Sequence, residues 1–146
     1  MDPSNTRLHE LLKALIRAVG MLHHALPGEP ITLSQVFALH ELDMGRPLSQ
    51  QELAERLGLE KSSVSRMAAD MERKGLLVRE RDPANRRFYR LALTDRGRAY
   101  HARAGALFRE RMAPLIDAMT AAERAALVKG LTGLVRVMHE QDARSS

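Results

Sequence analysis

The sequence has neither cysteine nor tryptophan, and its aromatic residues are two Tyr and three Phe. Without cysteine, a disulfide framework, a thiolate zinc site and a thiol-based redox switch are all excluded. No apolar run approaches the ~20 residues that a membrane-spanning helix needs. The N-terminal stretch carries acidic residues early and has no small-residue cleavage site after an apolar region, so a signal peptide is not expected. We therefore expect a cytoplasmic protein with no membrane contact.

The sequence also lacks the spacings that catalysis and metal binding require. It contains no nucleophile–base pair, no phosphate-binding glycine loop and no paired-acid motif, and the hydroxyls of Ser62 and Ser63 have no nearby base. The six histidines include no His-x-x-x-His pair, although His40, Glu41 and His101 could meet in the fold around a metal ion. Solvated or dimer-contact histidines are the favoured interpretation. An enzyme, a cofactor and a resident metal are therefore not expected.

Positive charge is concentrated in one segment. The chain carries 23 Lys and Arg against 18 Asp and Glu, a net charge of +5. Residues 56–98 alone contain twelve of the basic residues and six of the acidic ones. The net charge of this segment is therefore +6, which is larger than that of the whole chain. Charge gathered on one segment is typical of a phosphate-binding surface, whereas scattered charge would indicate only solubility.

Apolar residues make up 45% of the 146 positions, and their spacing predicts mostly helices. A stripe predicts a first helix over about residues 6–26, ended by the turn at 27–30. Thr32-x-x-Gln35 is a capping box that opens a second helix to about Asp43. The stripe consists of Leu8, Leu12, Leu15, Val19, Leu22 and Leu26.

Two long helices are predicted at the end of the chain. Thr94 caps the first, which extends to the region of Met119 and which Pro114 is expected to kink or end early. Thr120-x-x-Glu123 is a capping box for the last helix. That helix repeats the spacing of the first stripe at Leu127, Leu131, Leu134 and Met138.

Two short helices with a tight turn between them precede these long helices. Ser49-x-x-Glu52 caps a helix to Leu57, a turn covers residues 58–60, and a second helix runs from Lys61 to about Lys74. This order predicts a helix-turn-helix. The second helix points an apolar face inward and a small, basic face outward. The inward face carries Val64, Met67, Ala68 and Met71, and the outward face carries Ser62, Arg66, Ala69 and Arg73, with Ser65 on one flank.

The outward face suits contact with DNA. Arg66 is the best candidate for bidentate contact with a guanine. Ser62, Ser63 and Ser65 suit phosphate or base contacts near the positive end of the helix dipole. An ordinary surface helix with solvated serines is the alternative, and the helix alone does not decide between them.

A β-hairpin is predicted directly after the helix-turn-helix. Side chains alternate between two faces in a first run that ends at Arg81 and in a second run that begins at Phe88, and turn residues separate the two runs. Such a hairpin makes a wing that reaches a neighbouring minor groove, where arginine suits the negative potential. Protection of a sheet edge by charge is the alternative, but it does not account for two adjacent arginines at the tip. The hairpin arginines are Arg79, Arg81, Arg86, Arg87 and Arg90.

The segment from Leu48 to Arg98 resembles the winged-helix core of the MarR family of bacterial transcription regulators. Its SSVSR run, its helix end ERKGLL, its DPxxRR wing and its LTDRGR start of the next helix match in order and spacing. The resemblance covers nearly the whole chain and implies a single domain, 1–146, that is mainly α with a small β-hairpin. It implies a winged helix-turn-helix core at 32–98, flanked by helical dimerisation regions at 1–30 and 99–146.

The resemblance and the outward face of the helix together define a candidate DNA-binding set. The wing departs from the family pattern at one position. Family wings often carry aspartate directly before the paired arginines, whereas this sequence has Asn85 at that position. Asparagine keeps the turn but loses the charge that could orient Arg86. The candidate residues are Ser62, Ser63, Ser65, Arg66 and Arg73 on the recognition helix, and Arg86 and Arg87 on the wing.

The resemblance implies a homodimer that represses a pseudo-palindromic double-stranded DNA operator and is released by a small aromatic or phenolic effector. The apolar stripes of the first and last helices would form the dimer interface, and Arg17 and His40 are candidates to line the effector crevice. A sequence-indifferent architectural DNA binder and a winged-helix protein-interaction module are the alternatives. The serine and arginine face argues against the module, because protein interfaces usually present aromatic or aliphatic anchors.

Overall fold

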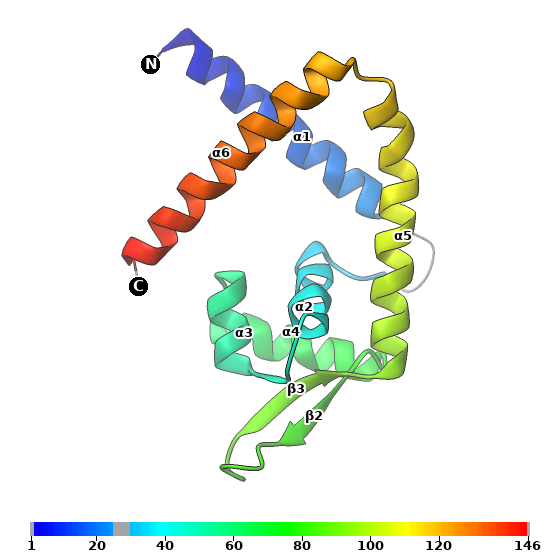
Figure 1. The fold of residues 1–146 in the computed structure, drawn as a ribbon. Coiled ribbons are helices and arrows are strands. Elements are labelled where there is room, and N and C mark those ends of the chain that lie inside the picture. The colour runs from blue at the N-terminus through cyan, green and yellow to red at the C-terminus, as the bar shows by residue number, and fades with distance from the viewer. Residues whose placement is uncertain (1, 25–29, 146) are drawn as a thin grey trace. The chain divides into compact units, whose positions relative to one another are not determined.

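The computed structural model describes residues 2–24 and 30–145, and Figure 1 shows the order of its elements. The chain divides into two compact units, Met1–Phe108 and Arg109–Ser146. The expected fold class, mainly α with a small β-hairpin, is confirmed. The helices are α1 (Pro3–His24), α2 (Leu33–Asp43), α3 (Gln50–Leu57), α4 (Lys61–Arg73), α5 (Asp95–Asp117) and α6 (Ala121–Ser145), and the strands are β1 (Leu48–Ser49), β2 (Leu77–Arg81) and β3 (Tyr89–Leu93).

The hydrophobic core lies in the first unit, where α2, α3 and α4 pack with the sheet. α4 buries Val64, Ala68 and Met71 and half-buries Met67, which confirms its predicted inward face. Complete burial of one such aliphatic side chain contributes about 1.5–3 kcal/mol. The remaining buried apolar residues of this core are Ile31, Ala38, Leu39, Leu42, Leu48, Leu53, Ala54, Leu76, Leu77, Leu91 and Leu93.

The sheet has three strands, one more than the predicted hairpin. β3 is the middle strand and pairs antiparallel with β2 on one side. On its other side it pairs with β1, where Leu48 lies opposite Leu91. β1 is two residues long, so no alternation marks it in the sequence. This short pairing joins the start of the helix-turn-helix to the wing, because α3 begins at the residue after β1.

Capping boxes begin α2 and α3, as the sequence predicts. The amide of Gln35 donates to Thr32 Oγ1 at 3.2 Å, and the amide of Thr32 donates to Gln35 Oε1 at 2.9 Å. Gln35 is also buried, and its Nε2 donates to Asp70 Oδ2 on α4 at 2.6 Å. One side chain therefore caps α2 and ties this helix to α4.

The start of α5 packs against the backbone at the end of α4. The hydroxyl of Thr94 donates to the carbonyl oxygen of Gly75 at 2.6 Å and accepts the amide of Gly97 at 2.9 Å. Gly97 is buried, and a Cβ at this position would overlap the carbonyl oxygen of Leu76. The glycine of the LTDRGR run is thus required by a close tertiary approach.

α1 leaves large apolar side chains exposed in the first unit. Leu8 and Leu15 of the predicted stripe are 54% and 44% exposed. Leu26 and the predicted turn at 27–29 lie outside the described residues, and so does the side chain of Leu22. In residues 2–24 and 30–145, no helix is both long enough and apolar enough to cross a membrane.

The second unit contains the end of α5 and all of α6. α5 continues through Pro114 to Asp117, close to its predicted end, so the proline does not end the helix at its own position. The predicted capping box of α6 is present, since the amide of Thr120 donates to Glu123 Oε2 at 2.8 Å and the amide of Glu123 donates to Thr120 Oγ1 at 3.2 Å. α6 exposes its apolar stripe at Leu127, Leu131, Leu134 and Met138.

Candidate nucleic-acid interface

The helix-turn-helix consists of α3 and α4, with Gly58 at the turn. Gly58 has φ 63° and ψ 34°, a left-handed conformation that glycine adopts without a Cβ clash. Its amide and that of Leu59 both donate to the carbonyl oxygen of Ala54. These bonds end α3 and turn the chain into α4.

α4 presents its predicted outward face to solvent. Ser62, Arg66 and Arg73 are exposed, and Ser63 and Ser65 are half-buried. Among the described residues, none forms an ion pair with Arg66. The guanidinium of Arg66 therefore keeps its five N–H donors for a ligand outside the chain.

The N-terminus of α4 has no side-chain cap. Glu60 is its N-cap residue, and the Glu60 side chain accepts no hydrogen bond from the helix. The N-termini of α2 and α3, in contrast, are satisfied by Thr32 and Ser49. The first amides of α4 thus remain donors at the positive end of the helix dipole, an arrangement suited to a phosphate.

Arg73 lies at the other end of the outward face and is tethered within α4. Its Nη2 is 2.9 Å from Asp70 Oδ1, although its side chain is 75% exposed. Lys74 Nζ contacts the same carboxylate at 2.8 Å and Gln35 Nε2 contacts it at 2.6 Å. Hydrogen bonds from Lys74, then Gln35 and then Arg73 hold the pKa of Asp70 well below its usual range. The charge of Arg73 is therefore partly balanced, unlike that of Arg66.

Ion pairs hold two of the hairpin arginines against the protein. Arg79 Nε lies 3.1 Å from Glu72 Oε2 of α4, and Arg90 Nε lies 3.0 Å from Asp82 Oδ2. The Asp82 carboxylate also accepts the amide of Ala84 at 2.8 Å. This amide is the main cause that lowers the pKa of Asp82, and the Arg90 bond adds to it. Arg79 therefore lies against α4 through an ion pair, and Arg90 ties β3 to the turn at Asp82.

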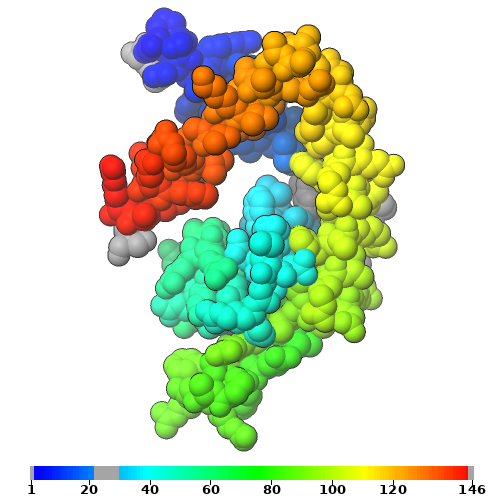
Figure 2. All heavy atoms as spheres, viewed as in Figure 1, coloured from blue at the N-terminus to red at the C-terminus, as the bar shows by residue number. Residues whose placement is uncertain are grey.

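The tip of the hairpin presents Arg86 and Arg87 to solvent. Both side chains are exposed, and neither pairs with a carboxylate in the described part of the chain. Asn85 keeps the expected turn, because its Oδ1 accepts the amide of Arg87 at 3.2 Å. In Figures 1 and 2 the loop between β2 and β3 projects beyond the helices of its unit.

Comparison with known proteins identifies the family. A sequence profile of the MarR family matches residues 30–87. CouR, a transcriptional repressor solved bound to a 23-mer DNA duplex, is 34% identical in sequence. The superposition has a TM-score of 0.73 and covers 86% of this chain and 89% of CouR. The chain belongs to the MarR family. The family inferred from the sequence is thereby confirmed.

Other relatives of this MarR-family protein are also named as regulators. The transcriptional repressor MdtR of Bacillus subtilis is 37% identical over 73 residues, which are 50% of this chain and 47% of MdtR. The regulator PcaV of Streptomyces coelicolor, solved with its natural ligand, is 28% identical with a TM-score of 0.65. That alignment covers 86% of this chain and 89% of PcaV. The chain spans about half the length of the curated relatives that it matches.

The first unit of this MarR-family chain contains a cavity of about 340 Å³ between α1, α2 and α5. Its lining includes Phe37 and His40 of α2 and His101 and Phe108 of α5. His40 is among the lining residues of this cavity, and Arg17 is not. Aromatic and aliphatic side chains form most of the wall, which also includes Val19, Leu33, Val36, Ala104 and Gly105.

A histidine–aspartate contact borders this cavity. His101 Nδ1 lies 3.0 Å from Asp43 Oδ2, and the rings of His40 and His101 are 5.6 Å apart between centroids. His40 and His101, which the sequence analysis allowed to meet, therefore lie close together. Among residues 2–24 and 30–145, however, no three His, Asp or Glu side chains converge on a metal position. No sequence pattern marks Asp43, which meets His101 because α2 and α5 pack together.

Proposed function

We propose that this MarR-family protein is a sequence-specific regulator of transcription that represses a double-stranded DNA operator. The observation that carries the proposal is a set of exposed arginines on neighbouring motifs, Arg66 on α4 and Arg86 and Arg87 at the hairpin tip, whose side chains have no ion-pair partner among residues 2–24 and 30–145. Arginine is the side chain that reads guanine bidentately and that enters narrow minor grooves. Repression is favoured over activation because CouR and MdtR are both named as transcriptional repressors.

The two motifs divide the DNA contacts between them. α4 enters the major groove, where Arg66 contacts a base edge and Arg73 contacts the backbone. Ser62, Ser63 and Ser65 and the uncapped amides beside them contact phosphate oxygens or bases. Arg86 and Arg87 reach the adjacent minor groove from the wing.

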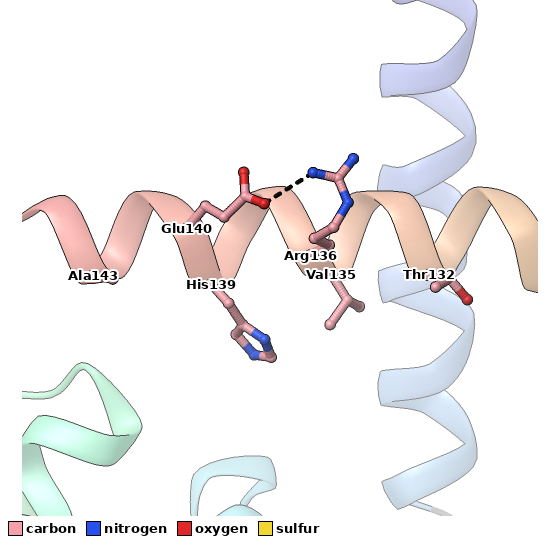
Figure 3. A pocket seen from close by; sticks show the side chains of 6 residues that line it. All are labelled: Thr132, Val135, Arg136, His139, Glu140 and Ala143. Atoms are coloured by element: carbon pink, nitrogen blue, oxygen red, sulfur yellow. Dashed lines mark hydrogen bonds and ion pairs between the residues drawn. The ribbon is translucent and has the colours of Figure 1, made fainter.

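A homodimer places two such units on one operator. Leu8 and Leu15 of the α1 stripe and the whole stripe of α6 are exposed, and burial of each Leu would contribute about 1.5–3 kcal/mol. Figure 3 shows Val135 and His139 on one side of α6, while Arg136 and Glu140 pair on another. Residues 1–30 and 99–146 are therefore proposed as the dimerisation region. Two α4 helices about one DNA turn apart would read a pseudo-palindrome.

A small aromatic or phenolic effector is proposed to release the repressor from DNA. The cavity of about 340 Å³ has the size of small-molecule sites, and the rings of Phe37 and Phe108 suit a planar ligand. The structure of PcaV with its natural ligand supports a ligand site in this chain as well. Such an effector acts only if it binds the DNA-competent and DNA-incompetent conformations with different affinity.

Selection of bound sequences from a genomic fragment library tests the proposal. We expect enrichment of a two-fold symmetric site that survives competition with bulk DNA. Retention of all fragments equally would identify an architectural binder, and retention of none at low ionic strength would favour the protein-interaction module. Either result would refute the proposed function.

Arg66→Ala tests base recognition on the selected site. We expect a loss of about 1–3 kcal/mol in binding free energy and relaxed preference at one base pair. Arg56→Ala is the matched control, because it removes the same charge from α3, which carries none of the proposed DNA-contact residues, and it should leave the base preference intact. An unchanged preference in Arg66→Ala would remove this residue from base readout.

A further inference from the structure

Arg81 joins three parts of the wing at the end of β2. Its Nη1 donates to the carbonyl oxygen of Arg86 at 2.6 Å, and its guanidinium carbon lies 4.7 Å from the centroid of the Tyr89 ring. Arg81 and Tyr89 are directly opposite each other in the register of β2 and β3. A hydrogen bond and a cation–π contact therefore hold the same guanidinium group.

Several other hydrogen bonds hold the turn, but among the described residues none of them involves Arg86. The Asp82 carboxylate accepts the amide of Ala84 at 2.8 Å, the amide of Asp82 donates to the carbonyl oxygen of Phe88 at 2.9 Å, and the amide of Phe88 donates to the carbonyl oxygen of Asn85 at 3.0 Å. Arg86 and Arg87 carry adjacent like charges, and no described carboxylate pairs with either side chain. Asn85 contributes a neutral acceptor, 3.2 Å from the amide of Arg87, where family wings often carry a carboxylate. The bond from Arg81 to the Arg86 carbonyl is shorter and has a charged donor, so it is the stronger of the two.

We infer that Arg81 is a positioning residue that orders the wing tip before DNA arrives. Its guanidinium, stacked on Tyr89, fixes the backbone at Arg86 and thereby sets the direction in which Arg86 and Arg87 leave the hairpin. Order that exists before binding lowers the entropic cost of association. This inference rests on the proposed DNA-binding function. The competing role for Arg81 is a direct contact with a phosphate.

A double-mutant cycle separates these two roles. Arg81→Met and Tyr89→Leu are each made in the wild-type protein and in the Arg86→Ala/Arg87→Ala protein, and affinity for the selected operator is measured. Both changes should weaken binding roughly 5- to 20-fold in the wild type, a coupling typical of residues in contact. Each should change it less than about 2-fold when the tip arginines are absent. Tyr89→Leu alters no charge, so its effect cannot come from lost attraction to phosphate.

Trypsin cleavage of the free protein reports on the tip without DNA. Cleavage after Arg86 and Arg87 needs local opening of the loop, and we expect it to be at least about 3-fold faster in Arg81→Met and Tyr89→Leu. Arg103→Met is the matched control, because Arg103 also lies over a tyrosine ring, at 5.8 Å from the centroid of Tyr100 on α5. This control should cleave at the tip like the wild type.

Three results would overturn the inference. Equal losses from Arg81→Met in both backgrounds, with a harmless Tyr89→Leu, would assign Arg81 to direct phosphate contact. Unchanged tryptic cleavage at the tip would show that Arg81 does not order it. Faster cleavage in Arg103→Met would trace the effect to charge alone. If the wild type bound no DNA fragment, the proposed function would fail, while the trypsin comparison would still decide whether Arg81 holds the tip.

Discussion

Asp70 connects α4 to α2, and its replacement by alanine should destabilise the protein measurably. Its carboxylate receives Gln35 Nε2 at 2.6 Å, Lys74 Nζ at 2.8 Å and Arg73 Nη2 at 2.9 Å. Lys74 Nζ also donates to the carbonyl oxygen of Pro30 at 2.7 Å. Asp70→Ala therefore removes the common acceptor of three donors that come from two helices.

The structure sets the size of the expected loss. Gln35 is 3% exposed, so without Asp70 its amide stays buried and unpaired, which costs about 1–3 kcal/mol. The pair with Arg73 is largely solvated and contributes less than about 1 kcal/mol. The Asp70 side chain is 33% exposed, and water screens part of its attraction to Lys74. We expect the free energy of unfolding to fall by about 2–3 kcal/mol.

The same contacts predict how this loss depends on pH. They lower the pKa of Asp70 in the folded state, with the Lys74 hydrogen bond as the largest cause. The contribution of a carboxylate with a lowered pKa is fully present above its unfolded pKa of about 3.9 and is lost as the pH falls through the folded pKa. The unfolding free energies of the wild type and Asp70→Ala should therefore differ by a constant amount from about pH 7 to 5 and converge below about pH 4.

Urea unfolding followed by circular dichroism measures both effects. Protein concentration must be fixed, because dimerisation would add to the apparent stability. Asp95→Ala is the matched control, since Asp95 makes the same kind of pair with Arg98 at 2.7 Å but is 100% exposed. Its loss should change the free energy of unfolding little, because water screens the pair. The reasoning would be refuted if Asp70→Ala were no more destabilising than this control. It would also be refuted if the difference in unfolding free energy between the wild type and Asp70→Ala were unchanged at pH 3.

Two further predictions concern the core of the first unit. Gly97→Ala should lower the free energy of unfolding by at least about 1–3 kcal/mol, because the new methyl group overlaps the carbonyl oxygen of Leu76. A melting temperature like that of the wild type would contradict this close approach. Leu91→Ala should cost about 2–5 kcal/mol in urea unfolding, because Leu91 is fully buried in the middle strand. Val78→Ala on β2, where the side chain is 38% exposed, should cost much less, and equal losses would place Leu91 outside the core.

Short-range signals explain why most elements could be predicted from the sequence. A capping box such as Thr32–Gln35 or Thr120–Glu123 is complete within four consecutive residues, so its meaning does not depend on the rest of the fold. The inward face of α4 follows from the helical period alone. β1 was missed because two residues carry no period, and only its partner β3 makes it a strand.

The candidate site was predicted less evenly. The exposed positions of Ser62 and Arg66 follow from the same period that places Val64 in the core. The sequence singled out Arg86 and Arg87 by their place at the tip, but it gave no partners for the other hairpin arginines. In the structure Arg79 and Arg90 pair with carboxylates, and Arg81 bonds to the tip backbone. Which arginine is left for DNA depends on the acceptors that the folded hairpin brings within reach. The DNA contacts themselves stay a prediction.

By itself the sequence determined the helices, their caps, the inward face of α4 and the resemblance to MarR regulators. Each of these rests on residues within a few positions of one another, where backbone geometry alone decides which side chains meet. The tertiary structure decided the contact of Gln35 with Asp70, the need for Gly97 against Leu76, and the cavity between α1, α2 and α5. These contacts join residues that only the packing of the core brings together, so no local pattern encodes them.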